Sequence, residues 1–276
     1  MEKVKYYNHS LVPCGTIKDE LSLSKEELRE AFKKYKKALF LTYTSNFDCG
    51  YDTGWYYVIK DDDEDYLSKM SRKHRYNLSR ISRFVECREI VASDYSERIK
   101  EIGFASVKNY SHYKKNSQHF SYSDSRTIVG AFVKNSDTLI GFEIIGLNGN
   151  EIDLVGEKCD PTYRSLGASY ALNEYIVKKY LPEVLPNGGY ISNGSKNVVH
   201  ETNHHQFLID NLGFRYAYCY LHIEYRNSMK VLIPILRVLK PLLKLFDRSH
   251  LIHSVNSVLV IDKIVRQQKR RFKDYV

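Results

Sequence analysis

The chain has 276 residues, of which 43% are hydrophobic and 27% charged, so it can bury a full core and is not a disordered chain. Its net charge of +9 is confined to residues 226–276, where twelve Lys and Arg stand against three Asp and Glu. The preceding residues are balanced in charge, which argues against a nucleic-acid binder that uses its whole surface.

The five cysteines are scattered along the chain and never spaced C-x-x-C. This usage is typical of a reducing compartment and argues against a cysteine-based zinc site. The chain begins without an apolar signal segment and has no run of about 18 apolar residues. We therefore expect a cytoplasmic protein without a membrane-spanning helix.

The first 83 residues predict a mixture of helices and strands. Ser24 and Glu27 form a capping box that opens a helix, and residues 39–44 and 55–59 each have the pattern of a strand. A basic helix follows an acidic run; its apolar side begins at Leu67 and includes Met70, and its basic stretch from 71 to 83 is SRKHRYNLSRISR. Its cations either contact phosphate groups of a substrate or form a solvated face paired with the acidic run.

From residue 84 the order of predicted elements is β-α-βββ-α-β-α-β. Asn-rich turns at 135–137 and 148–150 separate three strands and favour antiparallel hairpins. The predicted ranges are strand 84–91, helix 94–109, strands 127–133, 139–147 and 151–155, helix 168–180, a strand at 190, a helix from 202, and a strand 214–225.

The segment from 189 to 225 carries a family resemblance. Asn203 lies at the opening of a short helix that ends in Leu212-Gly213-Phe214 and leads into a last strand. This segment resembles the C-terminal end of the GNAT acyltransferase superfamily. It is closer still to FemAB-like members found among bacterial cell-envelope and polysaccharide proteins.

The resemblance implies an α/β (α+β) fold with a GNAT-like mixed, mostly antiparallel sheet, helices on both faces, and a C-terminal helical tail. We divide the chain into an N-terminal α/β segment (1–83), interpreted as a truncated GNAT-like half, a GNAT-like acyltransferase domain (84–225), and a basic amphipathic tail (226–276).

The predicted donor site is the start of the helix at 168. GNAT enzymes bind the pyrophosphate of acetyl-CoA with a Q/R-x-x-G-x-G/A loop, where free backbone N–H groups and the helix dipole meet an anion. The segment Arg164-Ser-Leu-Gly167-Ala168-Ser169 is similar to that loop, although Ser169 stands where the family has Gly or Ala. The alternative is an ordinary helix start with glycine in the turn.

The resemblance also implies the catalytic residues. Residues 154–157 and 191–193 would form the walls of a gap for the acyl carrier, and Asn193 and Asn203 would hydrogen-bond the pantetheine arm or the substrate. Glu157, His200 and Glu201 are the candidates for the base that deprotonates an amine. Leu208 stands where many GNAT enzymes have a tyrosine acid, so the usual acid of the family is missing.

A zinc site is an alternative interpretation of the same segment. His200-Glu201-x-x-His204 fits the H-E-x-x-H pattern of metallopeptidases. However, Thr202 and Asn203 are capping residues, so His200 would precede the first helical turn. We expect no metal and attribute the pattern to capping chemistry.

The tail predicts a basic amphipathic helix. Five cations, the first Lys230 and the last Arg248, fall on one side of a helical wheel, and leucines and isoleucines fill the other. Such a helix either binds an anionic membrane surface through 229–276 or packs its apolar side on the domain. Pro234 and Pro241 are expected to break it into short pieces, before a second helix from 250 to about 271.

The function predicted from these features is transfer of an acyl group, such as acetyl, from acetyl-CoA or another acyl-CoA to an amine. The resemblance implies a cell-envelope or polysaccharide precursor, small or lipid-linked, as the acceptor. Aminoacyl transfer from an aminoacyl-tRNA is the second hypothesis, and a non-catalytic scaffold at the inner face of the membrane is the third.

Overall fold

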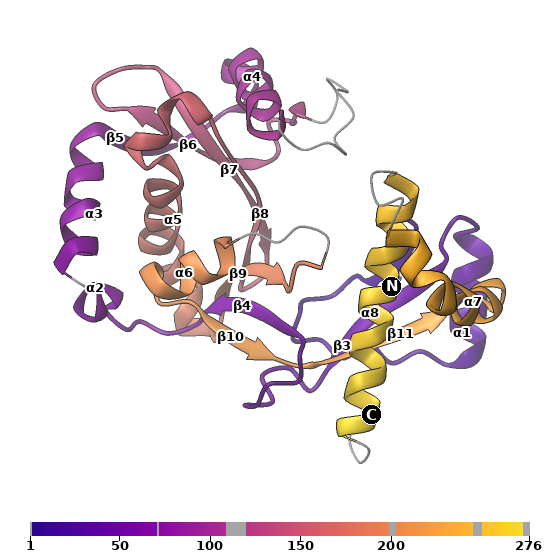
Figure 1. The fold of residues 1–276 in the computed structure, drawn as a ribbon. Helices are drawn as coiled ribbons and strands as arrows, with labels where there is room; N and C mark the ends of the chain where they lie inside the picture. Colours follow the sequence, from indigo (N-terminus) through magenta and orange to yellow (C-terminus); the bar gives the residue numbers. More distant parts are fainter. Residues whose placement is uncertain (1, 71, 109–119, 199–202, 245–249, 273–276) are drawn as a thin grey trace. The chain divides into compact units, whose positions relative to one another are not determined.

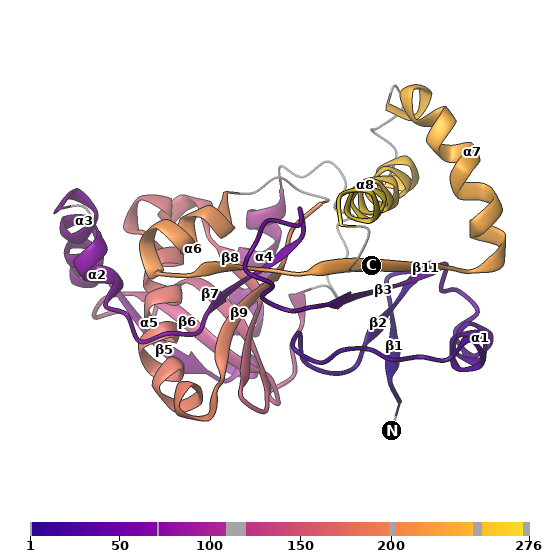
Figure 2. The same ribbon diagram turned by 90° about the horizontal axis from the view of Figure 1, so that it is seen from below.

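The computed structural model describes residues 2–70, 72–108, 120–198, 203–244 and 250–272. The chain forms two compact units (Figures 1 and 2). The first unit contains residues 1–57, 195–201 and 216–276, and the second contains 58–194 and 202–215. These units divide the chain differently from the predicted boundaries at 83/84 and 225/226, because the tail lies in one unit with the N-terminal strands.

The first unit is built on a four-stranded sheet in the order β1-β2-β3-β11. The helix α1 (Lys25–Lys34) begins at Ser24, whose hydroxyl accepts from the Glu27 N–H while the Glu27 carboxylate accepts from the Ser24 N–H, as the capping box predicts. The strands are β1 (Val4–Tyr7), β2 (Ser10–Pro13), β3 (Phe40–Ser45) and β11 (Tyr220–Tyr225). The two short strands β1 and β2 were not predicted, since a polar, tyrosine-rich segment lacks a clear alternating pattern.

Helices α7 (Asn227–Lys244) and α8 (His250–Arg271) complete this unit, and α8 packs on β11. Gln268 of α8 is buried, donates to the carbonyl of Thr53 at 3.1 Å, and accepts from the N–H of Leu221 at 3.0 Å. A buried amide that satisfies backbone groups of two other segments fixes the position of the helix.

The prediction that Pro234 and Pro241 break the tail helix is wrong, because α7 continues through both prolines. Met229 and Ile233 of α7 are buried against Leu259 of α8. We attribute the continuity to this packing, which offsets the hydrogen bond that each proline removes. No helix among the described residues is both long and apolar enough to cross a membrane.

The second unit is built around a mixed sheet in the order β10-β4-β9-β8-β7-β6-β5, and the chain crosses between the units within β4 and β10. The three strand pairs from β5 to β8 are antiparallel, and β8 and β9 are parallel. The strands are β4 (Tyr56–Lys60), β5 (Val85–Ile90), β6 (Thr127–Val133), β7 (Leu139–Asn148), β8 (Glu151–Cys159), β9 (Tyr190–Ser195) and β10 (Arg215–Tyr218).

Helices cover both faces of this sheet. Phe132 of β6 and Phe142 of β7 pack with Ile99 and Ile102 of α4 (Ser96–Val107), whereas Gly141 of β7 faces the start of α5 (Ala168–Val184). Gly141 and Phe142 are adjacent in β7, so the alternation of side chains along a strand places them on opposite faces of the sheet. The helices α4 and α5 therefore cover different faces. The predicted mixed, mostly antiparallel sheet is therefore confirmed, and α6 (His204–Leu212) follows β9 as expected.

Two predicted elements are each divided in the structure. The predicted strand 214–225 forms β10 and β11 in two different sheets, and Cys219 between them donates its N–H to Trp55 and accepts from Thr53. The basic helix is divided into α2 (Tyr66–Lys69) and α3 (Arg72–Phe84), because Met70 adopts an extended backbone with ψ of 146°. Neither break is visible in the local periodicity.

Candidate active site

The candidate site lies in the second unit, where the parallel strands β8 and β9 separate. Their pairing runs from Glu151 opposite Tyr190 to Asp153 opposite Ser192, and no pairing follows among the remaining residues of the two strands. Beyond that point β8 continues along β7 as far as Cys159. Residues 154–157, the predicted first wall of a gap for an acyl carrier, lie beyond the end of this pairing. In the predicted second wall (191–193), Ile191 and Ser192 are still paired with β8, and Asn193 lies beyond the pairing.

The segment before α5 has the geometry of a helix start without a cap. A short 3-10 turn (Pro161–Leu166) ends at Gly167, which has φ +78° and donates its N–H to Arg164. No side chain caps α5. Its first N–H groups, those of Ala168 and Ser169 included, thus carry the positive end of the helix dipole without a side-chain acceptor.

Gly167 is required by its surroundings as well as by its backbone. A Cβ atom at this position would lie 2.6 Å from the side chain of Ile81 in α3. The predicted role of Gly167 was close approach of a phosphate, and the structure shows a second reason, which is close packing of α3 against the start of α5. Arg164 is exposed, whereas Ala168 is buried.

A cavity of about 330 Å³ opens beside this helix start. It is lined by residues of α3, the 3-10 turn, α5 and α6: Arg80, Ile81, Ser165, Gly167, Tyr170, Phe207 and Asn211. The hydroxyl of Tyr170 donates to the carbonyl of Asn211 at 3.2 Å, and the Tyr170 and Phe207 rings meet edge to face. Tyr170, Phe207 and Asn211 were not among the site residues predicted from the sequence.

Two carboxylates form the polar centre of the sheet below α5. Glu143 of β7 and Glu157 of β8 are direct cross-strand partners, and Glu143 is only 1% exposed. Glu157 accepts a hydrogen bond from the Asn173 amide at 2.7 Å, and Glu143 accepts from the Gly156 N–H at 2.9 Å. Burial, and then the charge of Glu157, raise the pKa of Glu143 well above its usual value.

Glu157 was predicted from the sequence, and Glu143 was not. The missed signal is an acidic residue inside the apolar strand LIGFEII, since a glutamate is almost never fully buried without a specific partner. Asn173 is also buried, and its Oδ1 has no hydrogen-bond partner among the described residues. Glu143, Glu157 and Asn173 together form a polar cluster of two carboxyl groups and one amide.

The predicted amides have different positions. Asn193 lies on β9, and its carbonyl is 3.4 Å from Nε2 of His205, whose pKa is lowered by burial. Asn203 occupies the N-cap position of α6, but its side chain makes no capping hydrogen bond. The prediction that Asn203 caps this helix through its side chain is therefore not supported.

The remaining candidates involve the H-E-x-x-H segment. His200 and Glu201 lie outside the described residues, so their predicted role as the base stays a prediction, and the zinc alternative is not tested at these two positions. His204 opens α6 and stacks on Phe207 at 5.9 Å. Leu208, in place of the tyrosine acid of the family, is fully buried. Within the described ranges, no cluster of three metal-ligating side chains occurs.

No protein-family model and no curated protein matches the chain, but solved structures share its fold. L-PGS from Bacillus licheniformis superimposes with a TM-score of 0.53 and 15% identity, over 95% of this chain and 85% of that one. The C-terminal domain (DUF2156) of a putative lysylphosphatidylglycerol synthetase from Agrobacterium fabrum gives 0.48 and 10%, over 86% and 83%.

A GCN5-related N-acetyltransferase-like protein from Streptococcus suis gives a TM-score of 0.36 and 15% identity, over 74% of this chain and 69% of that one. At 15% identity, the likeness to L-PGS concerns the fold alone. The element order and the mixed sheet are those of the predicted GNAT-like fold.

Proposed function

We propose that the second unit is an acyltransferase that moves an acyl group, such as acetyl, from a CoA thioester to an amine. The observation that carries the proposal is the separation of β8 from β9 beyond Asp153, with Glu157 on the diverging part of β8. The gap would receive the acyl end of the donor, and a carboxylate would then lie beside the reacting carbonyl.

In the proposed reaction the amine nitrogen attacks the thioester carbonyl carbon, the N–C bond forms, and the C–S bond breaks. The CoA thiolate leaves and becomes the free thiol by taking up the proton that Glu157 has received from the amine. Glu157 accepts the proton of the amine, as a general base does. Burial and the charge of Glu157 raise the pKa of Glu143 and so favour its protonated form. The amide of Asn173 holds the Glu157 carboxylate in position.

The phosphate groups of the donor would lie at the start of α5. An uncapped helix N-terminus attracts anions, and Arg80 adds a full positive charge in the same cavity. Ser165 and Asn211 supply further polar groups there. This set of groups fits an anionic carrier better than a neutral one.

The test is titration calorimetry of the full chain with acetyl-CoA. We expect saturable binding, weakened about tenfold by Arg80→Gln through loss of a charge-assisted contact. Arg83→Gln is the matched control, because Arg83 is exposed on the same helix and does not line the cavity. Failure of acetyl-CoA to bind the wild-type chain, or equal binding by the two variants, would refute a CoA donor at this cavity.

A second candidate is aminoacyl transfer from an aminoacyl-tRNA, as the FemAB-like resemblance implies. The hydroxyl of Tyr170 donates to the carbonyl of Asn211 and so joins α5 to α6 at the cavity. A pantetheine arm that passes through this cavity would meet the bond, so the bond favours a donor without such an arm. Binding of an aminoacylated tRNA acceptor stem, together with no binding of acetyl-CoA, would support it. Binding of neither donor would leave the scaffold hypothesis.

We also propose that the tail contacts an anionic membrane surface, which would bring the enzyme to a lipid-linked acceptor of the cell envelope. Five apolar residues of α7 are exposed: Val231, Leu232, Ile235, Val238 and Leu239. They form a stripe on one side of the helix, here called the α7 apolar stripe. An exposed apolar stripe flanked by cations suits the interface of a bilayer.

A further inference from the structure

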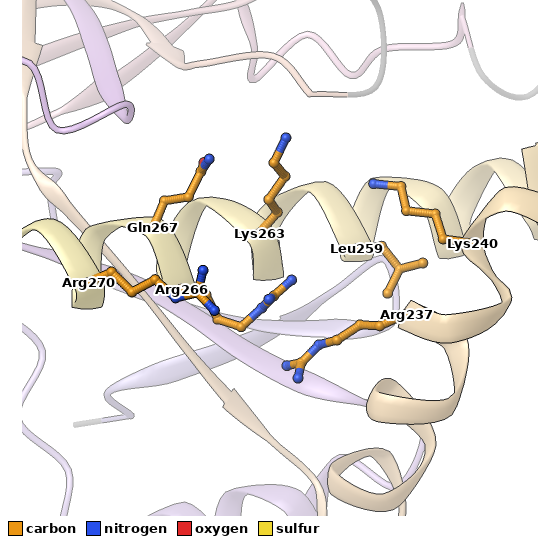
Figure 3. Close-up of a pocket in the computed structure, with 7 residues that line it drawn as sticks. All are labelled: Arg237, Lys240, Leu259, Lys263, Arg266, Gln267 and Arg270. Atoms are coloured by element: carbon orange, nitrogen blue, oxygen red, sulfur yellow. The ribbon is translucent and has the colours of Figure 1, made fainter.

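A second cavity lies in the first unit, between α7 and α8, and has a volume of about 370 Å³. Five cationic side chains line it: Arg237, Lys240, Lys263, Arg266 and Arg270. Figure 3 shows Lys263 and Gln267 projecting from the same side of α8, with Lys240 of α7 reaching toward them. We call this cavity the α7–α8 cation pocket.

Two of the arginines are held in place by a buried carboxylate. Asp262 is 2% exposed and accepts from Arg237 at 2.9 and 2.6 Å and from Nε of Arg266 at 2.9 Å. The hydroxyl of Tyr225 donates to the same carboxylate at 3.1 Å. Both guanidinium groups are therefore oriented before a ligand arrives, and each keeps N–H donors that Asp262 does not use.

The charge of the pocket is not balanced from within. Among the described residues, Asp262 is the one acidic side chain with a salt bridge to a cation of the pocket. Lys240, Lys263 and Arg270 have no acidic partner in the part of the chain that the structure describes. Like charges held around a concave site repel one another, and a bound multivalent anion removes that cost.

We infer that the α7–α8 cation pocket binds the phosphate group of a small ligand, either a free phosphorylated compound or the headgroup of an anionic phospholipid. Oriented guanidinium groups match the oxygens of phosphate, and the cavity volume is that of a small-molecule site. An RNA backbone instead needs an extended row of cations, which a single concave cluster does not provide.

The pocket is distinct from the α7 apolar stripe. At 3.6 residues per turn, Lys240 and Val238 lie about 160° apart around α7. A bilayer lying on the stripe would therefore leave the pocket on the other side of the helix. The pocket can be tested with soluble ligands, independently of binding to membranes and of the proposed acyl transfer.

The experiment is titration of the full chain with two probes, inorganic pyrophosphate and monomeric dihexanoylphosphatidylglycerol. We expect saturable binding of at least one probe, weakened about tenfold or more in Lys263→Gln/Arg270→Gln. Both residues are exposed and hold no described salt bridge, so the variant is expected to fold. Lys269→Gln, an exposed lysine of α8 outside the pocket, is the control and should keep wild-type affinity.

The two probes separate the ligand sources. Tighter binding of the lipid, displaced by pyrophosphate, identifies a headgroup site, whereas binding of pyrophosphate alone identifies a free phosphorylated ligand. The inference is overturned if neither probe binds, or if the double variant and Lys269→Gln bind equally well. Binding of a tRNA transcript that depends on Lys263 and Arg270, without binding of either probe, would also overturn it in favour of an RNA surface.

Discussion

Glu143 and Glu157 lie opposite each other on neighbouring strands, and the buried Glu143 accepts a hydrogen bond from the Gly156 N–H next to its partner. Burial of Glu143, and then the charge of Glu157, oppose ionisation of Glu143 and raise its pKa. The first prediction follows from this coupling.

Glu143 should make the free energy of unfolding fall as the pH rises. Its pKa is raised in the folded chain, so the folded state holds a proton that the unfolded state has lost above the ordinary value of 4.5. The contribution of Glu143 to the free energy of unfolding is therefore complete below about pH 4.5 and decreases as the pH rises toward the folded pKa. Glu143→Gln should flatten that decline in urea unfolding measured across pH, whereas Glu183→Gln, exposed on α5, should not.

Glu157→Gln should slow acyl transfer about 10²–10⁴-fold while leaving binding of acetyl-CoA unchanged, since it removes a general base and keeps the shape of the side chain. The measurement is thiol release from acetyl-CoA with an amine that the wild-type chain acylates. Glu183→Gln serves again as the control. A rate within threefold of wild type would exclude Glu157 as the base.

Gly167→Ala should destabilise the chain by about 1–3 kcal/mol, because alanine disfavours φ of +78° and its Cβ would meet Ile81. Gly149→Ala isolates the backbone effect, since Gly149 has φ of +60° and nothing within 4 Å of a Cβ. The difference between the two variants in urea unfolding measures the packing of α3 on α5. Equal losses would show that Ile81 moves aside at no cost.

Asp262→Asn should destabilise the first unit by about 1.5–3 kcal/mol, the range for hydrogen bonds to charged groups. Burial opposes the charge of Asp262, but the hydrogen bonds of Arg237 and Arg266 outweigh it and lower its pKa. The stabilisation by the Asp262 charge is thus complete above about pH 3.8 and is lost as the pH falls through the folded pKa of Asp262. Urea unfolding at pH 7 should show this loss for Asp262→Asn and not for the control Asp94→Asn, because Asp94 is exposed.

Val231→Ser/Val238→Ser should weaken partitioning to vesicles that contain anionic phospholipid, because it removes apolar area from the α7 apolar stripe without changing charge. These side chains are 70% and 80% exposed, so folding should be unaffected. The matched control is Val91→Ser/Leu147→Ser, which removes exposed apolar side chains from the second unit. Unchanged partitioning of the α7 variant would remove the membrane proposal.

The sequence alone determined the features that depend on neighbours along the chain. The Ser24–Glu27 capping box, the hairpins between β6, β7 and β8, and the start of α5 at Ala168 are set by residues within a few positions of one another. The backbone adopts them because local hydrogen bonds and turn residues favour one conformation. The GNAT-like order of elements follows from them.

Only the tertiary structure decided which distant residues meet. β3 pairs with β11, so that Ser45 lies opposite Tyr220, and Glu143 becomes the partner of Glu157 through the register of β7 and β8. The same is true of α7, which continues through Pro234 because it packs on α8, and of the cations that gather around Asp262. Local periodicity carries no information about such contacts, since burial of apolar surface and the pairing of strands depend on residues far apart in the chain.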